Sequence, residues 1–183
     1  MRYQLLVILL ISYSSSFCQL TENNQNKYWG TFGFAGYEDG FGLGVSADYL
    51  KNSNYWKLRY IKVYEFAFEI FSHTEPYEKF YDIGLLYGRI TNTKIVRFSI
   101  SGGLGIFGGI KRGDFLFTNQ VSSWNYINYY KENQIFSPSI PIEVGMNLMP
   151  LDILGIGISG FANINFKKSL IGFIIKVECG RIR

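Results

Sequence analysis

The sequence has few of the residues that catalytic and metal sites need. It contains one histidine, His73, and two cysteines, Cys18 and Cys179, which lie far apart and lack the paired spacing of metal ligands. Its 18 Lys and Arg residues are scattered, whereas a nucleic-acid-binding surface needs them clustered. We therefore expect no metal, no cofactor and no nucleic-acid partner.

Leu-rich helical stretches are also absent after the first dozen residues, and the remainder contains no amphipathic helix of useful length. Aromatic residues make up 18% of the 183 residues, and glycine accounts for 20 of them. Aromatic and β-branched side chains suit the pleated surface of a sheet. The length allows one domain with a real core. The composition therefore predicts a single all-β domain.

The N-terminal segment has the layout of a secretory signal peptide. Arg2 precedes an apolar run at residues 5–11, which is shorter than the about 20 residues that a membrane-spanning helix needs. Small residues follow, and Cys18 stands just before the expected cleavage site. We expect a cleaved signal peptide over residues 1–18 and a polar lead over residues 19–27. A lipoprotein attached through Cys18 is the alternative.

Residues 28–183 divide into segments of alternating apolar and polar residues, separated by turn residues. The connections after the second, fourth and sixth segments are tight, and those after the third and fifth are long. Short turns at one end and longer loops at the other are the layout of an outer-membrane barrel. The sequence predicts an all-β, eight-stranded antiparallel up-and-down transmembrane β-barrel with short periplasmic turns and longer extracellular loops. The predicted strands are 28–35, 41–51, 55–66, 79–90, 94–110, 136–149, 153–166 and 169–182.

The two faces of these strands differ in a way that indicates which one meets lipid. One face is apolar, and the other is rich in Gly and Ser and poor in long solvating side chains, as expected for a crowded lumen. Lys62 falls on the apolar face and should lie near a membrane rim, where a charge costs less. Pro138 and Pro141 lack the N–H of the β-ladder, so the sixth strand should begin outside the membrane or carry a bulge there.

The same assignment places nine charged residues inside the barrel. Charges removed from water are costly unless they are paired, and eight strands leave an interior that side chains alone can fill. We therefore expect an ion-pair network and a plugged lumen rather than an open pore. Solvated charges on a soluble sheet are the alternative. The nine residues are Asp48, Lys57, Arg59, Glu65, Asp82, Arg97, Glu143, Lys176 and Glu178.

These features together resemble the small eight-stranded outer-membrane proteins, both the OmpA-transmembrane and OmpX-like barrels and the PorT-like outer membrane β-barrel domains. Tyr28, Trp29, Tyr55 and Trp56, near predicted periplasmic ends, match an aromatic girdle. The resemblance implies export to the outer membrane of a Gram-negative cell. It also implies two partners, the outer-membrane lipid and the barrel-assembly machinery during biogenesis.

Two connections carry the candidate functional residues. The third holds His73, and barrel enzymes that act on lipid A or on peptides resemble one another in using a rim histidine. A lone histidine in a loop is more often an ordinary surface residue. The fifth interleaves aromatic side chains with Asn, Ser and Gln, a mixture that favours binding. The same segment could instead extend two strands as a hairpin whose aromatics pair. Its aromatic residues are Phe115, Phe117, Trp124, Tyr126, Tyr129 and Tyr130.

Three functions are compatible with these residues. The first is a structural or interaction protein whose outer loops contact a protein or a surface glycan. The second is a rim-located, lipid-modifying enzyme that uses His73. The third is a secreted soluble barrel that binds a small apolar ligand. We expect the first, and no catalytic activity.

Overall fold

The computed structural model describes residues 26–38, 40–65, 72–92, 95–122 and 125–181. The predicted signal peptide lies outside the described residues, as does nearly all of the polar lead. None of the described residues forms a helix long and apolar enough to span a membrane.

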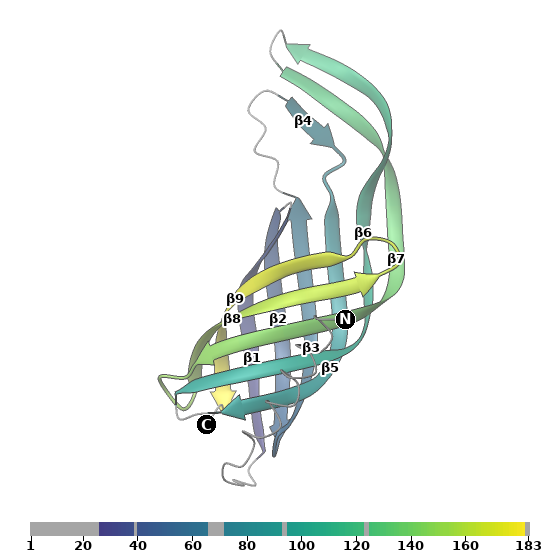
Figure 1. Cartoon of the computed structure of the whole chain (residues 1–183). Helices are drawn as coiled ribbons and strands as arrows, with labels where there is room; N and C mark the ends of the chain where they lie inside the picture. The colour runs from purple at the N-terminus through teal and green to yellow at the C-terminus, as the bar shows by residue number, and fades with distance from the viewer. Residues whose placement is uncertain (1–25, 39, 66–71, 93–94, 123–124, 182–183) are drawn as a thin grey trace, which may run out of the picture.

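Eight strands close into an antiparallel barrel (Figure 1). Each pairs with its neighbour along the chain, and β1 pairs with β9 to close the ring. The predicted eight-stranded up-and-down barrel is therefore confirmed. The barrel strands are β1 (Lys27–Tyr37), β2 (Gly40–Lys51), β3 (Asn54–Glu65), β5 (Lys79–Asn92), β6 (Val96–Ser122), β7 (Asn125–Leu148), β8 (Leu154–Asn165) and β9 (Leu170–Arg181).

Two strands are much longer than predicted. β6 and β7 remain paired beyond Ile110 and Gln134, and Figure 1 shows them rising from one end of the barrel as a curved hairpin. A short strand that the sequence did not predict, β4 (Ser72–Glu75), pairs in parallel with β7 beside this hairpin. We call this end of the barrel the hairpin end. The opposite end, which carries the connections β2–β3, β5–β6 and β7–β8, is the turn end.

The apolar face of the strands points outward. Leu104 is 77% exposed and Ile171 is 72% exposed, whereas Arg59 and Arg97 are almost fully buried inside the barrel. In a soluble protein, large apolar side chains are mostly inside and unpaired charges outside. The reversed arrangement is that of a barrel whose outer wall meets lipid, and the predicted assignment of faces is confirmed.

The structure shows where the residues that depart from the alternating pattern lie. Lys62 points outward near the hairpin end, where its Nζ lies 5.1 Å from the centre of the Tyr64 ring. Pro138 is exposed on the outer wall, and Pro141 faces the lumen. The β6–β7 register is the same on both sides of Pro141, so the expected bulge is not at the prolines. The register shifts instead lie within the hairpin, beyond Arg112.

Candidate functional site

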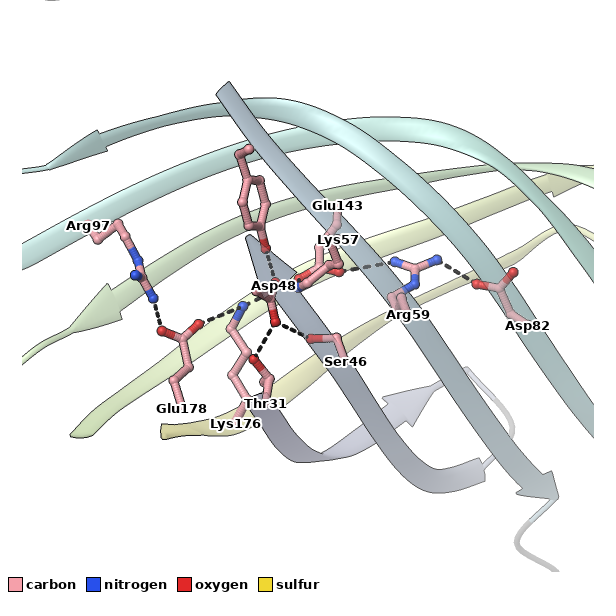
Figure 2. A network of polar contacts seen from close by, with 11 residues as sticks. Thr31, Ser46, Asp48, Lys57, Arg59, Asp82, Arg97, Glu143, Lys176 and Glu178 are labelled. Carbon is pink, nitrogen blue, oxygen red and sulfur yellow. Dashed lines mark hydrogen bonds and ion pairs between the residues drawn. The ribbon is translucent and has the colours of Figure 1, made fainter. Parts of the chain in front are cut away.

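A carboxylate in the middle of the lumen gathers three cations. Glu143 on β7 has a side chain that is 2% exposed, and its Oε1 lies 2.6 Å from Lys57 Nζ and 3.3 Å from Lys176 Nζ. Its Oε2 lies 3.2 Å from Arg59 Nη1. Lys57 and Arg59 belong to β3, which does not pair with β7, so these contacts cross the barrel (Figure 2). The central charge contacts therefore tie together strands that share no β-ladder.

A second carboxylate, Asp48, is held mainly by hydroxyl groups. Thr31 and Ser46 donate hydrogen bonds to its Oδ2 at 2.9 Å and 2.6 Å, and the Tyr55 hydroxyl donates to its Oδ1. Lys57 Nζ lies 3.7 Å from the same Oδ1. Three donors and a nearby cation offset the desolvation of this buried anion.

The network continues to both sides of Glu143. Toward the hairpin end, Arg59 Nη2 lies 2.5 Å from Asp82 Oδ2. Toward the turn end, Glu178 pairs with Arg97, and Lys176 Nζ lies 3.6 Å from Glu178 Oε1. Eight of the nine predicted residues thus meet in one network with equal numbers of acids and bases. The acids are Asp48, Asp82, Glu143 and Glu178, and the bases are Lys57, Arg59, Arg97 and Lys176.

Glu65, the ninth predicted residue, lies apart from this network at the hairpin end. Its carboxylate pairs with Arg112 and accepts a hydrogen bond of 3.0 Å from the Glu78 N–H. Glu78 in turn accepts a 2.6 Å bond from Lys168 Nζ and a 3.0 Å bond from the Arg112 N–H. Glu78, Arg112 and Lys168, which cluster with Glu65 at the hairpin end, were not predicted as site residues. Each falls in a segment predicted as a loop, where alternation does not show which way a side chain points.

Two apolar clusters enclose the charged layer. The cluster at the turn end includes Trp29 and Tyr55, whose rings stack with centroids 5.9 Å apart. Their predicted place in an outer aromatic girdle is wrong, because both side chains point into the lumen and are at most 4% exposed. Tyr28 and Trp56 do lie on the outer wall. The turn-end cluster is Trp29, Leu50, Tyr55, Ile90 and Met149, and the hairpin-end cluster is Ala35, Ile61, Val63, Phe80, Phe107, Phe161, Leu170 and Ile174.

Cations lie over aromatic rings where the charged and apolar layers meet. The Arg97 guanidinium lies 4.2 Å from the centre of the Trp29 ring, and Lys168 Nζ lies 4.6 Å from that of Phe80. Such contacts stabilise a partly desolvated cation without a second carboxylate. A cavity beside Glu143 and Lys176 has a volume of about 10 Å³, room for roughly one water molecule.

Five of the six aromatic residues of the fifth connection form part of the β6–β7 hairpin. The Phe117 and Tyr129 rings stack with centroids 4.8 Å apart, and Phe115 meets Tyr130 edge to face at 5.5 Å. Cross-strand aromatic pairs stabilise a two-stranded ribbon. Phe115 and Phe117 nevertheless remain 54% exposed. The predicted hairpin and an exposed aromatic surface thus occur together.

The structure gives less information on the three remaining candidate residues, Trp124, Tyr126 and His73. Tyr126 is 40% exposed on the hairpin, and Trp124 lies outside the described residues. The backbone of His73 in β4 pairs with Ile127 of β7. Over the part of the chain that the structure describes, no group of three or more His, Cys, Asp or Glu residues could hold a metal ion.

Comparison with known proteins identifies the fold but no family. No protein family matches the sequence, and no curated protein matches it either. Among solved structures, the chain is similar to Neisserial surface protein A (NspA), with 12% identity and a TM-score of 0.57 over 84% of this chain and 96% of that one.

Two further structures have a comparable likeness. Ail, the attachment invasion locus protein of Yersinia pestis, is 11% identical with a TM-score of 0.55, over 85% of this chain and 98% of its own. The N-terminal β-barrel domain of Pseudomonas aeruginosa OprF is 15% identical with a TM-score of 0.53, over 85% and 96%. At these identities the likeness shows a shared fold, that of small outer-membrane barrels.

Proposed function

We propose that this chain is an outer-membrane β-barrel protein with a structural and interaction role, whose protruding hairpin contacts a protein or a surface glycan. The observation that carries the proposal is the reversed barrel, with an apolar outer wall around a paired, buried charge network. Such a large apolar surface is unfavourable in water, whereas the hydrocarbon chains of a membrane would cover it. The turn end faces the periplasm and the hairpin end faces outward, because short periplasmic turns and longer outer loops are the usual arrangement.

Two observations support contact through the hairpin. Phe115, Phe117 and Tyr126 are exposed, although the two phenylalanines already pair across the two strands. Aromatic residues among polar neighbours are frequent at binding surfaces. Ail, which shares the fold, has been solved in complex with sucrose octasulfate, a heparin analogue. That contact supports a glycan as one class of partner for this chain.

The lumen is plugged in this proposal. The charged layer lies between two apolar clusters, so an ion crossing the barrel would have to break buried pairs and pass both clusters. Single-channel recording in a planar bilayer should detect no conductance above that of the bare membrane. Regular, stepwise conductance from the purified barrel would contradict the plug.

The test of the interaction role removes the hairpin and keeps the barrel. A variant in which a two-residue turn replaces residues 112–133 retains the β6–β7 pairs below Ile110. Both proteins, in nanodiscs, are compared on an array of surface glycans and for adhesion to coated extracellular proteins. We expect binding by the full chain to be lost in the shortened one, which still migrates faster before boiling than after. Equal binding by the two proteins would contradict the role of the hairpin.

Membrane placement is tested separately by fractionation. Recovery of the full chain in the soluble periplasmic or secreted pool without detergent would contradict the proposal. The rim-enzyme alternative predicts that His73→Ala abolishes a lipid A modification, and an unchanged activity in that variant would remove it.

A further inference from the structure

A hollow in the outer wall of the barrel lies below the base of the hairpin. It has a volume of about 610 Å³, within the usual size range of small-molecule sites. Its lining comes from β3, β5, β6 and β7, the four neighbouring strands of this part of the wall. The side chains that matter below are Lys62, Tyr64, Lys79, Tyr81 and Phe136.

Gly109 on β6 lines the hollow, and its neighbour Gly108 lies beside it. Gly108 pairs with Tyr81 on one side and with Phe136 on the other, and the end of the Tyr81 side chain lies over its backbone. A Cβ atom on Gly108 would lie 2.5 Å from the Tyr81 hydroxyl oxygen. Gly109 has a φ of 150°, and its Cβ would lie 2.0 Å from the Lys79 carbonyl oxygen. A side chain at Gly108 would therefore displace Tyr81 at the edge of the hollow, and one at Gly109 would displace the β5 backbone that forms its wall.

Two lysines and two tyrosines alternate at the upper edge of the hollow. Lys62 pairs across the β3–β5 ladder with Tyr81, and Tyr64 pairs with Lys79. The two lysines are diagonal neighbours, about 7–8 Å apart at their Cα atoms. Among the described residues, neither lysine forms an ion pair with a carboxylate, and no Asp or Glu lines the hollow.

From this edge toward the turn end, the outer wall of the barrel is apolar. Ile83 and Ile106 face each other across the β5–β6 ladder and are 42% and 43% exposed, and Phe136 is 65% exposed. An exposed lysine on a lipid-facing wall is unfavourable, less so near the interface than toward the midplane. A phosphate group at the level of the lysines would offset that cost through charge-assisted hydrogen bonds.

We propose that this hollow binds one membrane lipid by its phosphate headgroup, with an acyl chain lying on the apolar wall below. Lys62 and Lys79 hold the phosphate, and Tyr64 and Tyr81 donate hydrogen bonds at the headgroup level. The occupant is a lipid rather than a free anion because the hollow opens onto the apolar wall. The inference rests on the membrane placement proposed above and adds a specific ligand class to it.

The test measures retention of a defined lipid by native mass spectrometry. The full-length mature barrel in an uncharged detergent is titrated with phosphatidylglycerol, and separately with diacylglycerol that has the same acyl chains but no phosphate. The double variant Lys62→Gln/Lys79→Gln removes both cations without altering the lumen. Lys167→Gln is the matched control, because Lys167 is exposed at the same end of the barrel and outside the hollow.

We expect phosphatidylglycerol to be retained at least tenfold better than diacylglycerol, and the double variant to lose about tenfold in affinity while the control loses none. Equal retention by the wild type and the double variant would overturn the inference, as would equal retention of the two lipids. Displacement of phosphatidylglycerol by an equal concentration of inorganic phosphate would show an ion site, and would also overturn it. These outcomes leave fractionation unaffected, so failure of this inference is distinct from failure of the membrane placement.

Discussion

Replacing Glu143 with Gln tests whether the charged layer stabilises the barrel. The side chain keeps its size and one carbonyl oxygen but loses the charge that faces Lys57, Arg59 and Lys176 at 2.6–3.3 Å. The network in the lumen would then contain three acidic and four basic side chains. The lumen would then hold an unpaired positive charge in a layer enclosed by two apolar clusters.

The size of the effect follows from the distances. At an effective dielectric constant of 20, each of the three ion pairs attracts by about 5–6 kcal/mol before desolvation is subtracted. Desolvation costs several kcal/mol per ion, so the net loss on removing one partner of a buried pair is about 3–5 kcal/mol. We expect Glu143→Gln to lower the free energy of unfolding by that amount. Adding Lys176→Met removes one stranded cation and should recover about 1–2 kcal/mol.

The assay is reversible urea unfolding in lipid vesicles, followed by tryptophan fluorescence and by the shift in gel migration on boiling. Glu132→Gln is the matched control, because it makes the same change on β7 at an exposed position. It should alter the free energy of unfolding by less than about 0.5 kcal/mol. The reasoning is refuted if Glu143→Gln costs less than about 1 kcal/mol, or if the costs of Glu143→Gln and Lys176→Met simply add.

Three further outcomes are expected from other parts of the barrel. Gly88→Ala should destabilise the barrel by about 1–3 kcal/mol, because its Cβ would lie 1.9 Å from a backbone carbonyl oxygen, whereas Gly160→Ala, with no atom within 4 Å, should be neutral in the same unfolding assay. Arg97→Lys keeps the charge but loses the guanidinium that lies over the Trp29 ring, so we expect a loss of about 1–2 kcal/mol and a changed Trp29 emission maximum. Phe117→Ala should speed hydrogen exchange in the hairpin and leave exchange in the barrel unchanged, since its stacking partner lies in the hairpin.

The period-two pattern was sufficient to predict most of the barrel wall. Side chains in a strand alternate between two faces, so the composition of each face shows what it meets. The Gly- and Ser-rich face of β8, which includes Ser159, was correctly assigned to the lumen while Ile158 was assigned outward. The same rule placed Arg59 and Glu143 inside. It could not show that they touch, because that depends on how the ring closes.

The errors arose where residue type was used in place of alternation, and where a contact joins segments far apart in the sequence. Ile61 and Phe80 are apolar and face the lumen, so apolar character alone does not show which face a residue occupies. Trp29 was assigned to the outer girdle from residue type, although its neighbour Tyr28 already occupies the outward position. β4 is short and pairs in parallel with a distant segment, and no local periodicity predicts such a contact.

The charged layer also constrains the register of the barrel. Lys57 lies directly opposite Asp48 on β2, and it also reaches Glu143 across the lumen. A one-residue slip of β3 would turn Lys57 and Arg59 toward lipid, and a two-residue slip would remove Lys57 from Asp48. A two-residue slip in either direction would replace one outward apolar residue with another. The apolar outer wall therefore does not oppose such a slip. The paired charges therefore favour one register more strongly than the mainly apolar outer wall does.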